Sequence, residues 1–174
     1  MRQDLVKKIQ AAIPGNSIGR YDLLPLFADA GLFSQIVRYI SAEFIGKCEY
    51  IASPEATGWI LGTALAKELG VGFIALRKGN KLPYPRETIS SASYLDYSGD
   101  EKSLELVAGS LAAGSKVLIV DEWIETGASI RACMALLERE GCLISGLATI
   151  GINDNDDTKR WIDDGFVTFI GMDI

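Results

Sequence analysis

The residues with the clearest chemical pattern lie between positions 117 and 130. An apolar run at 117–120 ends in two acids, Asp121 and Glu122, and three residues later comes the turn Thr126-Gly127-Ala128-Ser129. A turn of this kind at the start of a helix offers N–H and O–H groups to a phosphate. The acids would repel a phosphate, but they can accept hydrogen bonds from two sugar hydroxyls. The segment therefore predicts a sugar-phosphate site at the carboxyl end of a strand.

Two other phosphate-binding motifs are excluded in this segment. It has no Gly-Lys-Ser/Thr, so it is not a Walker A loop, and no GxGxxG, so it is not a dinucleotide-binding loop. A simpler interpretation also fits, in which Asp121 and Glu122 only end a strand and Thr126 only caps a helix.

The amino-acid composition limits the available chemistry. The 174 residues include no histidine, which excludes Ser-His and Cys-His mechanisms and leaves acid-base chemistry to carboxylates, Lys or Tyr. The three cysteines, Cys48, Cys133 and Cys142, are widely spaced and form no CxxC pair. They predict buried, reduced thiols and no zinc site.

The net charge of −6 argues against nucleic-acid binding, which normally needs a positive surface. No apolar run approaches the roughly 18 residues needed to span a bilayer. The first residues do not form a signal peptide. We therefore expect a cytoplasmic protein that binds neither nucleic acid nor a membrane.

Apolar spacing predicts alternating helices and strands. Helices are expected at 2–12, at 22–30 with Gly31 as the break, and at 32–44, 58–69, 127–140 and 158–163; strands are expected at 48–52, 72–76, 117–120, 143–152 and 166–170. Buried strands joined by such helices indicate parallel pairing. The expected fold is α/β, a parallel twisted sheet with helices on both faces, in a single domain over residues 1–174.

Residues 78–111 differ from this alternation. They are rich in Ser, Tyr, Gly and Pro, and they alternate apolar and polar residues at 89–94 and 104–107. The pattern predicts an inserted β-hairpin, which we expect to act as a flexible flap or lid above the sheet.

Segment 117–130 resembles the phosphoribosyl-pyrophosphate motif of the type I phosphoribosyltransferases, in which two acids and three variable residues precede Thr-Gly and a small or hydroxyl-bearing pair. Within that family the chain is most similar to the adenine phosphoribosyltransferases. Residues 77–83 with 86–89 resemble their flap entrance, and Tyr94-Leu95-Asp96-Tyr97 resembles their flap tip. The resemblance implies the type I fold, with residues 1–46 as an N-terminal helical hood.

The resemblance also implies roles for the matching residues. The two acids would hold the ribose 2′- and 3′-hydroxyls, the segment 125–129 would wrap the 5′-phosphate, and the loop at 53–58 would hold pyrophosphate. The implied phosphoribosyl-pyrophosphate contacts are Glu55, Ala56, Thr57, Arg77, Lys78, Lys81, Asp121, Glu122, Glu125, Thr126, Gly127, Ala128 and Ser129.

Catalytic roles would fall to Asp96, Glu125 and Arg77, and base contacts to Arg20, Tyr97 and Trp123. Mg²⁺, held mainly by the substrate, would be the cofactor, and the protein would be a homodimer. The alternatives are plainer: each cation could belong to a solvated surface cluster, and Tyr97 and Trp123 could line a core.

Several positions depart from the adenine pattern. Thr57 stands where those enzymes usually have arginine, Glu122 where they have aspartate, and Asp96 where they commonly have glutamate. Glu125 stands where they have a small residue, whereas hypoxanthine-guanine enzymes have an aspartate that meets purine N7. Glu125 could therefore act on the base, or it could be a solvent-facing loop carboxylate.

The implied reaction is purine salvage, the transfer of 5-phosphoribosyl from phosphoribosyl pyrophosphate to a purine base, with adenine as the first choice. It gives a nucleoside monophosphate and pyrophosphate. Alternatives are a 6-oxopurine or non-purine phosphoribosyltransferase, or a non-catalytic regulator that binds phosphoribosyl pyrophosphate or a nucleotide.

Overall fold

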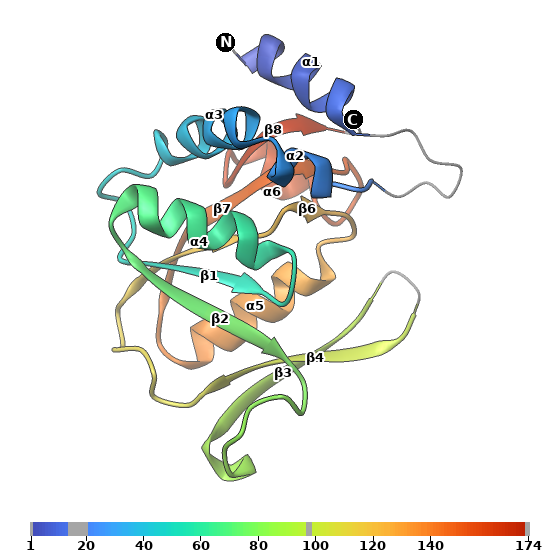
Figure 1. The fold of residues 1–174 in the computed structure, drawn as a ribbon. Coiled ribbons are helices and arrows are strands. Elements are labelled where there is room, and N and C mark those ends of the chain that lie inside the picture. Colours follow the sequence, from blue (N-terminus) through green and yellow to red (C-terminus); the bar gives the residue numbers. More distant parts are fainter. Residues whose placement is uncertain (1, 14–20, 97–98, 173–174) are drawn as a thin grey trace.

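The computed structural model describes residues 2–13, 21–96 and 99–172, and it is built around an eight-stranded sheet with the order β3-β4-β2-β1-β5-β7-β6 and with β8 paired to β7 (Figure 1). The central strands β1 (Tyr50–Pro54), β2 (Gly72–Lys78), β5 (Lys116–Val120) and β7 (Leu143–Ile152) pair in parallel. The short β6 (Trp123–Ile124) and β8 (Val167–Met172) also run parallel to β7.

Helices cover both faces of this sheet, because alternate residues of each buried strand point to opposite sides. In β5, Leu118 and Val120 pack in a cluster with α3 (Ala30–Ser41) and α4 (Gly58–Leu69). Val117 and Ile119 pack in a second cluster with α5 (Ala128–Arg139). The predicted α/β class is confirmed.

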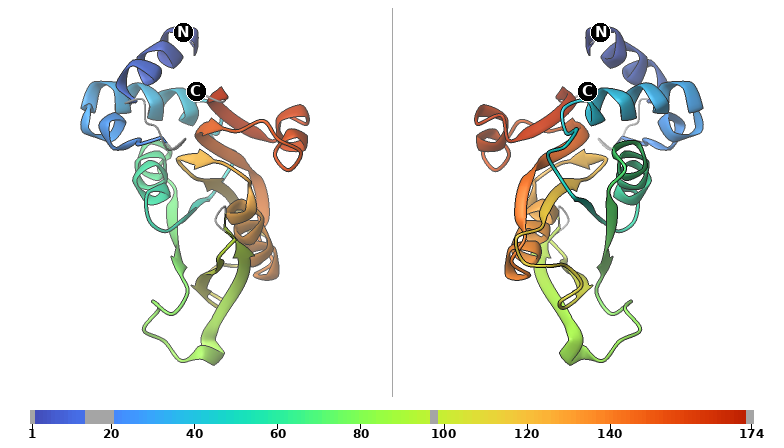
Figure 2. Two further views of the ribbon diagram at one scale, coloured as in Figure 1. Left: turned by 90° about the vertical axis from the view of Figure 1, so that its right-hand side faces the viewer. Right: turned by 90° about the vertical axis from the view of Figure 1, so that its left-hand side faces the viewer.

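The N-terminal helices α1 (Arg2–Ala12), α2 (Leu24–Ala28) and α3 lie at one end of the molecule (Figure 2). Arg2 Nε donates to the carbonyl of Ile170 in β8 at 3.1 Å, which ties α1 to the last strand. The prediction that Gly31 breaks a helix was wrong. Asp29 separates the two helices and caps α3 by accepting from the N–H of Gly31 and Leu32, so Gly31 lies inside α3. The predicted helix at 32–44 ends at Ser41, and Phe44 follows in a turn.

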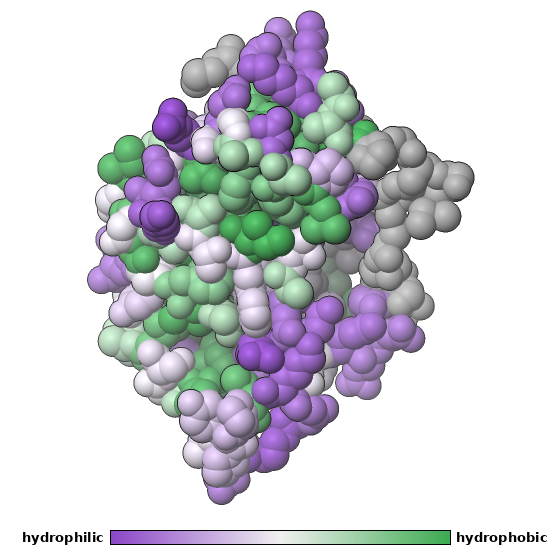
Figure 3. Space-filling view, viewed as in Figure 1, coloured by the Kyte–Doolittle hydropathy of each residue, from purple (hydrophilic) through white to green (hydrophobic). Residues whose placement is uncertain are grey.

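The inserted segment forms the hairpin of β3 (Ile89–Leu95) and β4 (Glu101–Val107), preceded by a 3-10 turn, Arg86–Thr88. It is not simply a lid above the sheet: β4 pairs antiparallel with β2 and so extends the sheet edge. Buried Glu105 holds the base of the hairpin by accepting from the backbone N–H of Asn80 at 3.0 Å and from Arg86. Hydrophilic side chains gather where Figure 1 places this hairpin (Figure 3).

The cysteines agree with the prediction from composition. Cys48, Cys133 and Cys142 are buried and free, as predicted. Within the described ranges, no helix has the length and apolar character needed to cross a membrane. The remaining helix, α6 (Lys159–Asp163), precedes β8.

Candidate functional site

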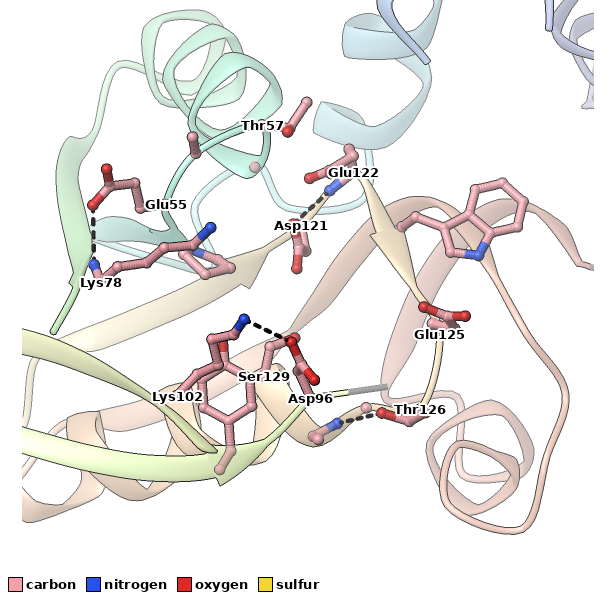
Figure 4. A pocket seen from close by; sticks show the side chains of 17 residues that line it. Glu55, Thr57, Lys78, Asp96, Lys102, Asp121, Glu122, Glu125, Thr126 and Ser129 are labelled. Carbon is pink, nitrogen blue, oxygen red and sulfur yellow. Dashed lines mark hydrogen bonds and ion pairs between the residues drawn. The ribbon is translucent and has the colours of Figure 1, made fainter. Parts of the chain in front are cut away.

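A cavity of about 340 Å³ opens at the carboxyl ends of β1 and β5, the edge where parallel α/β sheets bind ligands (Figure 4). The strand ends, the start of α4, the start of α5 and the β3–β4 hairpin all contribute to its wall. Its lining residues are Pro54, Glu55, Ala56, Thr57, Gly58, Lys78, Tyr94, Asp96, Lys102, Asp121, Glu122, Trp123, Glu125, Thr126, Gly127, Ala128 and Ser129.

The acid pair lies at the centre of this wall. Asp121 is buried, and its Oδ1 accepts from the backbone N–H of Glu122 at 3.0 Å. Burial, followed by the charge and hydrogen bond of the Glu122 carboxyl, raises the pKa of Asp121 well above its usual range. Glu122 Oε2 is also buried and has no hydrogen-bond partner among the described residues. A carboxyl pair with an unpaired buried oxygen is suited to hydroxyl donors from a ligand.

The turn at 126–129, called the phosphate turn below, comes three residues after the acid pair. Gly127 has a positive φ of 74°, a conformation that favours glycine. Ala128 N–H donates to Thr126 Oγ1 at 3.3 Å, and Ala128 and Ser129, the first two residues of α5, line the cavity. The N-terminal end of this 12-residue helix favours an anion here.

Asn155 braces this turn from the loop after β7, a role that the sequence did not suggest. Its Nδ2 donates to the carbonyl of Glu125 at 2.8 Å. Its Oδ1 accepts from the N–H of Asp157 and Thr158 at 3.0 and 3.2 Å. One side chain therefore connects the phosphate turn to the loop that precedes α6.

On the opposite wall, the Glu55 carboxylate contacts the three basic residues of the predicted pyrophosphate site. Its carboxylate accepts from Arg77 Nε at 3.1 Å, the N–H of Lys78 at 3.0 Å and Lys81 Nζ at 2.6 Å. Burial alone would raise the pKa of Glu55, but the hydrogen bonds from Lys81, Lys78 and Arg77 lower it to about 2. The peptide bond between Glu55 and Ala56 is cis.

Only one of the three predicted cations therefore lines the cavity. Arg77 and Lys81 face Glu55 and do not line the cavity, and Arg77 also lies over the Trp59 ring at 5.4 Å. Lys78 does line it, and Figure 4 shows its side chain extending toward Asp121.

The hairpin supplies the third part of the wall through Tyr94, Asp96 and Lys102. Lys102 Nζ lies 3.0 Å from Asp96 Oδ2 (Figure 4). No role had been predicted for Lys102, and Tyr94 had been identified only as part of the flap tip.

Trp123 closes the cavity toward the N-terminal helices. It lies opposite Gly151 in the β6–β7 pairing, where a Cβ would stand 2.1 Å from the indole. Its Nε1 donates to Asn153 Oδ1 at 2.7 Å, and its ring lies 4.4 Å from that of Tyr21. The two other residues predicted to contact a base, Arg20 and Tyr97, lie outside the described residues.

The cavity therefore brings together most of the predicted site. Of the described candidates, only Arg77 and Lys81 are absent from its wall. The residues without a predicted individual role are Pro54, Gly58, Tyr94 and Lys102, and Pro54 and Gly58 fall within the predicted loop at 53–58. The period-2 pattern of β4 could have indicated Lys102, since it shares a face with buried Leu104 and Leu106.

Among the described residues, no group of three or more His, Cys, Asp or Glu side chains is arranged to hold a metal ion. This does not conflict with Mg²⁺, which keeps several waters and commonly binds through one or two carboxylates and the phosphates of a substrate. The carboxylates on the cavity wall are oxygen donors of the type that Mg²⁺ accepts, so the residues fit an ion carried in by a polyphosphate.

Comparison with known proteins gives consistent results. The family model described as phosphoribosyl transferase domain matches residues 26–171. An adenine phosphoribosyltransferase of Leuconostoc citreum is 37% identical over 139 residues, which cover 79% of this chain and 76% of that protein.

Solved structures show the same likeness. The adenine phosphoribosyltransferase of Thermoanaerobacter pseudethanolicus superimposes with a TM-score of 0.84 at 29% identity, covering 96% of this chain and 99% of that chain. The enzyme of Saccharomyces cerevisiae, solved with adenine and an imino-altritol bisphosphate, has a TM-score of 0.73 at 26% identity and covers 98% of this chain and 89% of that chain.

Proposed function

This chain belongs to the phosphoribosyltransferase family, and we propose that it transfers the 5-phosphoribosyl group from phosphoribosyl pyrophosphate to adenine in purine salvage. The observation that carries the proposal is that one cavity holds both the Asp121–Glu122 pair and the phosphate turn. The names of the relatives support adenine as the acceptor.

In the proposed complex, the carboxyls of Asp121 and Glu122 accept hydrogen bonds from the ribose 2′- and 3′-hydroxyls. The turn at 125–129 binds the 5′-phosphate with the first N–H groups of α5 and the hydroxyls of Thr126 and Ser129. The backbone at 55–57 binds pyrophosphate. When bound, Mg²⁺ neutralises the charge of the leaving pyrophosphate; it would be held mainly by oxygens of the substrate.

The reaction forms a bond between purine N9 and C1 of the ribose and breaks the bond from C1 to the pyrophosphate oxygen, while the base loses its N9 proton. Catalysis then depends on orientation and charge neutralisation. Asp96 lies on the hairpin side of the cavity, where a carboxylate can accept a hydrogen bond from the base. Trp123, which lines the cavity and packs against Tyr21, offers an aromatic surface to the base.

Arg77 and Lys81 contact Glu55 in the structure. We propose that they hold the pyrophosphate loop in place through this carboxylate. Arg77 can contact the leaving group only if its guanidinium exchanges Glu55 for pyrophosphate. If Arg77 has this catalytic role, Arg77→Met should lower kcat more than Lys81→Met does.

One observation favours a second candidate, transfer to a 6-oxopurine. Glu125 is exposed to the cavity beside the phosphate turn, and its carboxylate could exchange a proton with purine N7. The choice of bases in the test also separates these two candidates from a non-purine enzyme and from a non-catalytic regulator.

The test is pyrophosphate release from phosphoribosyl pyrophosphate and Mg²⁺ with adenine, hypoxanthine, guanine, xanthine and a pyrimidine base. The proposal expects release with adenine at the highest kcat/KM. Preference for a 6-oxopurine would support the second candidate, and preference for the pyrimidine a non-purine enzyme. Tight substrate binding without release for any base would support the regulator and overturn the enzyme.

We also propose that the enzyme is a cytoplasmic homodimer of single-domain subunits, with residues 1–46 as hood and 78–111 as flap. Three free, buried cysteines are compatible with a reducing compartment. Ile60 and Tyr84 are large apolar side chains that the single chain leaves exposed, as a subunit interface would require. Sedimentation equilibrium at the mass of one chain would contradict the dimer.

A further inference from the structure

The charge of the cavity wall does not match the charge of the proposed substrate. Five carboxylates line the cavity, but the only cations among its described lining residues are Lys78 and Lys102. One of the five, Glu55, is paired with Arg77 and Lys81, which lie outside the wall, so the other four carboxylates face only the two described lysines of the wall. A ligand with several phosphate charges therefore depends strongly on each of the two lysines.

Lys102 reaches the cavity because of its place in β4. It pairs in register with Tyr94 of β3, which also lines the cavity. Lys102, Leu104 and Leu106 occupy every second position of β4, so their side chains share one face of the strand. Leu104 and Leu106 are buried, which makes this the inward face. A lysine ammonium rarely points inward unless a group of opposite charge lies beside it.

Among the described residues, Asp96 is the nearer of two carboxylates that contact Lys102. Asp96 Oδ2 lies 3.0 Å from Lys102 Nζ, and Asp96 Oδ1 accepts from the N–H of Asp100 at 3.1 Å. Asp100 lies further from the ammonium, at 3.7 Å. The Asp96 side chain is 14% exposed and that of Lys102 is 39% exposed, and both line the cavity, so the carboxylate is largely enclosed while the ammonium stays accessible to a ligand.

We propose that Lys102 is a substrate-binding residue, whose ammonium exchanges Asp96 for phosphate oxygens of the phosphoribosyl substrate. A phosphate carries more negative charge than one carboxylate and offers several acceptor oxygens, so the exchange is favourable where the two compete. It also releases one oxygen of Asp96 toward the base. This inference rests on the proposed function, in which a phosphoribosyl compound occupies the cavity.

The test is a binding measurement that needs no turnover. Calorimetry with Mg²⁺ and phosphoribosyl pyrophosphate compares the unaltered protein with Lys102→Met, Lys102→Arg and the control Lys116→Met. Lys116 is exposed at the amino end of β5, on the opposite edge of the sheet, so its loss makes the same charge change away from the cavity. One charge-assisted hydrogen bond corresponds to a Kd about 10- to 100-fold higher in Lys102→Met, with Lys102→Arg within about threefold of the unaltered protein.

Separate titrations with pyrophosphate and with ribose 5-phosphate identify which phosphate Lys102 contacts, since only the ligand that it contacts loses affinity. If Lys102→Met lowers the thermal midpoint, Lys102→Gln replaces it. An unchanged Kd in a folded variant, or an equal loss in Lys116→Met, would overturn the inference. Lys102-dependent binding without pyrophosphate release in the presence of any of the bases would overturn the proposed function alone.

Discussion

Gly58 lies directly against Asp121: a Cβ on Gly58 would stand 2.7 Å from Asp121 Oδ1 and 3.5 Å from Glu122 Oε2. Gly58 is the first residue of α4, which packs against β1, whereas the acids follow β5. The absence of a side chain at this one position therefore lets the helix approach the acid pair closely.

Gly58→Ala should move the Asp121 carboxyl away from its place in the wall. Because small displacements of binding groups cost orders of magnitude, we expect the KM for phosphoribosyl pyrophosphate to rise about tenfold or more. The free energy of unfolding should change by no more than about 1 kcal/mol, since alanine is the better helix residue. Gly31→Ala, near the start of α3 and with 3.4 Å to its nearest neighbour atom, is the control. Equal KM values in the two variants would contradict this interpretation.

Asp121→Asn should make the ligand-free protein more stable as it loses activity. The folded pKa of Asp121 is raised, chiefly by burial and then by Glu122, so its contribution to stability is full below about pH 4 and is lost as pH rises through the folded pKa. The asparagine variant has no such loss. Urea unfolding at pH 5 and pH 8 should show a larger advantage of the variant at pH 8, and Glu122→Gln should show the same sign. An advantage independent of pH would contradict a shared, buried charge.

Long, regular elements could be predicted from the sequence, and short or locally capped ones could not. The predicted bounds of α4 and β7 agree with the structure, because buried residues recur at helical spacing in α4 and form one long run in β7. The two-residue β6 was missed, since two residues show no period. Gly31 was misread because a capping Asp29, not the glycine, sets the boundary between helices.

The site divides in the same way. Asp121, Glu122 and the phosphate turn lie in one continuous segment, so residue type and spacing were sufficient to group them. The direction of Arg77 and Lys81 depends on Glu55, more than 20 residues earlier in the chain, and nothing in the spacing indicates that partner. Asn155 was missed for a similar reason: its part is a hydrogen bond to a backbone carbonyl, which no sequence motif marks.

Asn155→Asp should separate the two functions of this side chain. An aspartate keeps the acceptor for the N–H groups of Asp157 and Thr158 but has no N–H for the carbonyl of Glu125. Loss of that one bond predicts a KM for phosphoribosyl pyrophosphate about three- to tenfold higher with little loss of stability. Asn155→Ala should lose about 1 kcal/mol of unfolding free energy as well, since it removes the side-chain acceptor of the two N–H groups, of which that of Thr158 is partly buried. Identical behaviour of the two variants in both measurements would contradict this division.

Glu125→Ala tests whether this carboxylate acts on the base. If it exchanges a proton with purine N7, its removal should lower kcat/KM for the 6-oxopurines about 100-fold, the lower end of typical general acid-base contributions, and leave adenine nearly unchanged. Glu125→Gln should behave like the alanine variant, because an amide binds but cannot take the proton. Asp154→Ala, which removes an exposed acid outside the cavity wall, is the control. Steady-state rates with adenine, hypoxanthine, guanine and xanthine decide the matter: an unchanged base profile in Glu125→Ala would make Glu125 a solvent-facing loop residue.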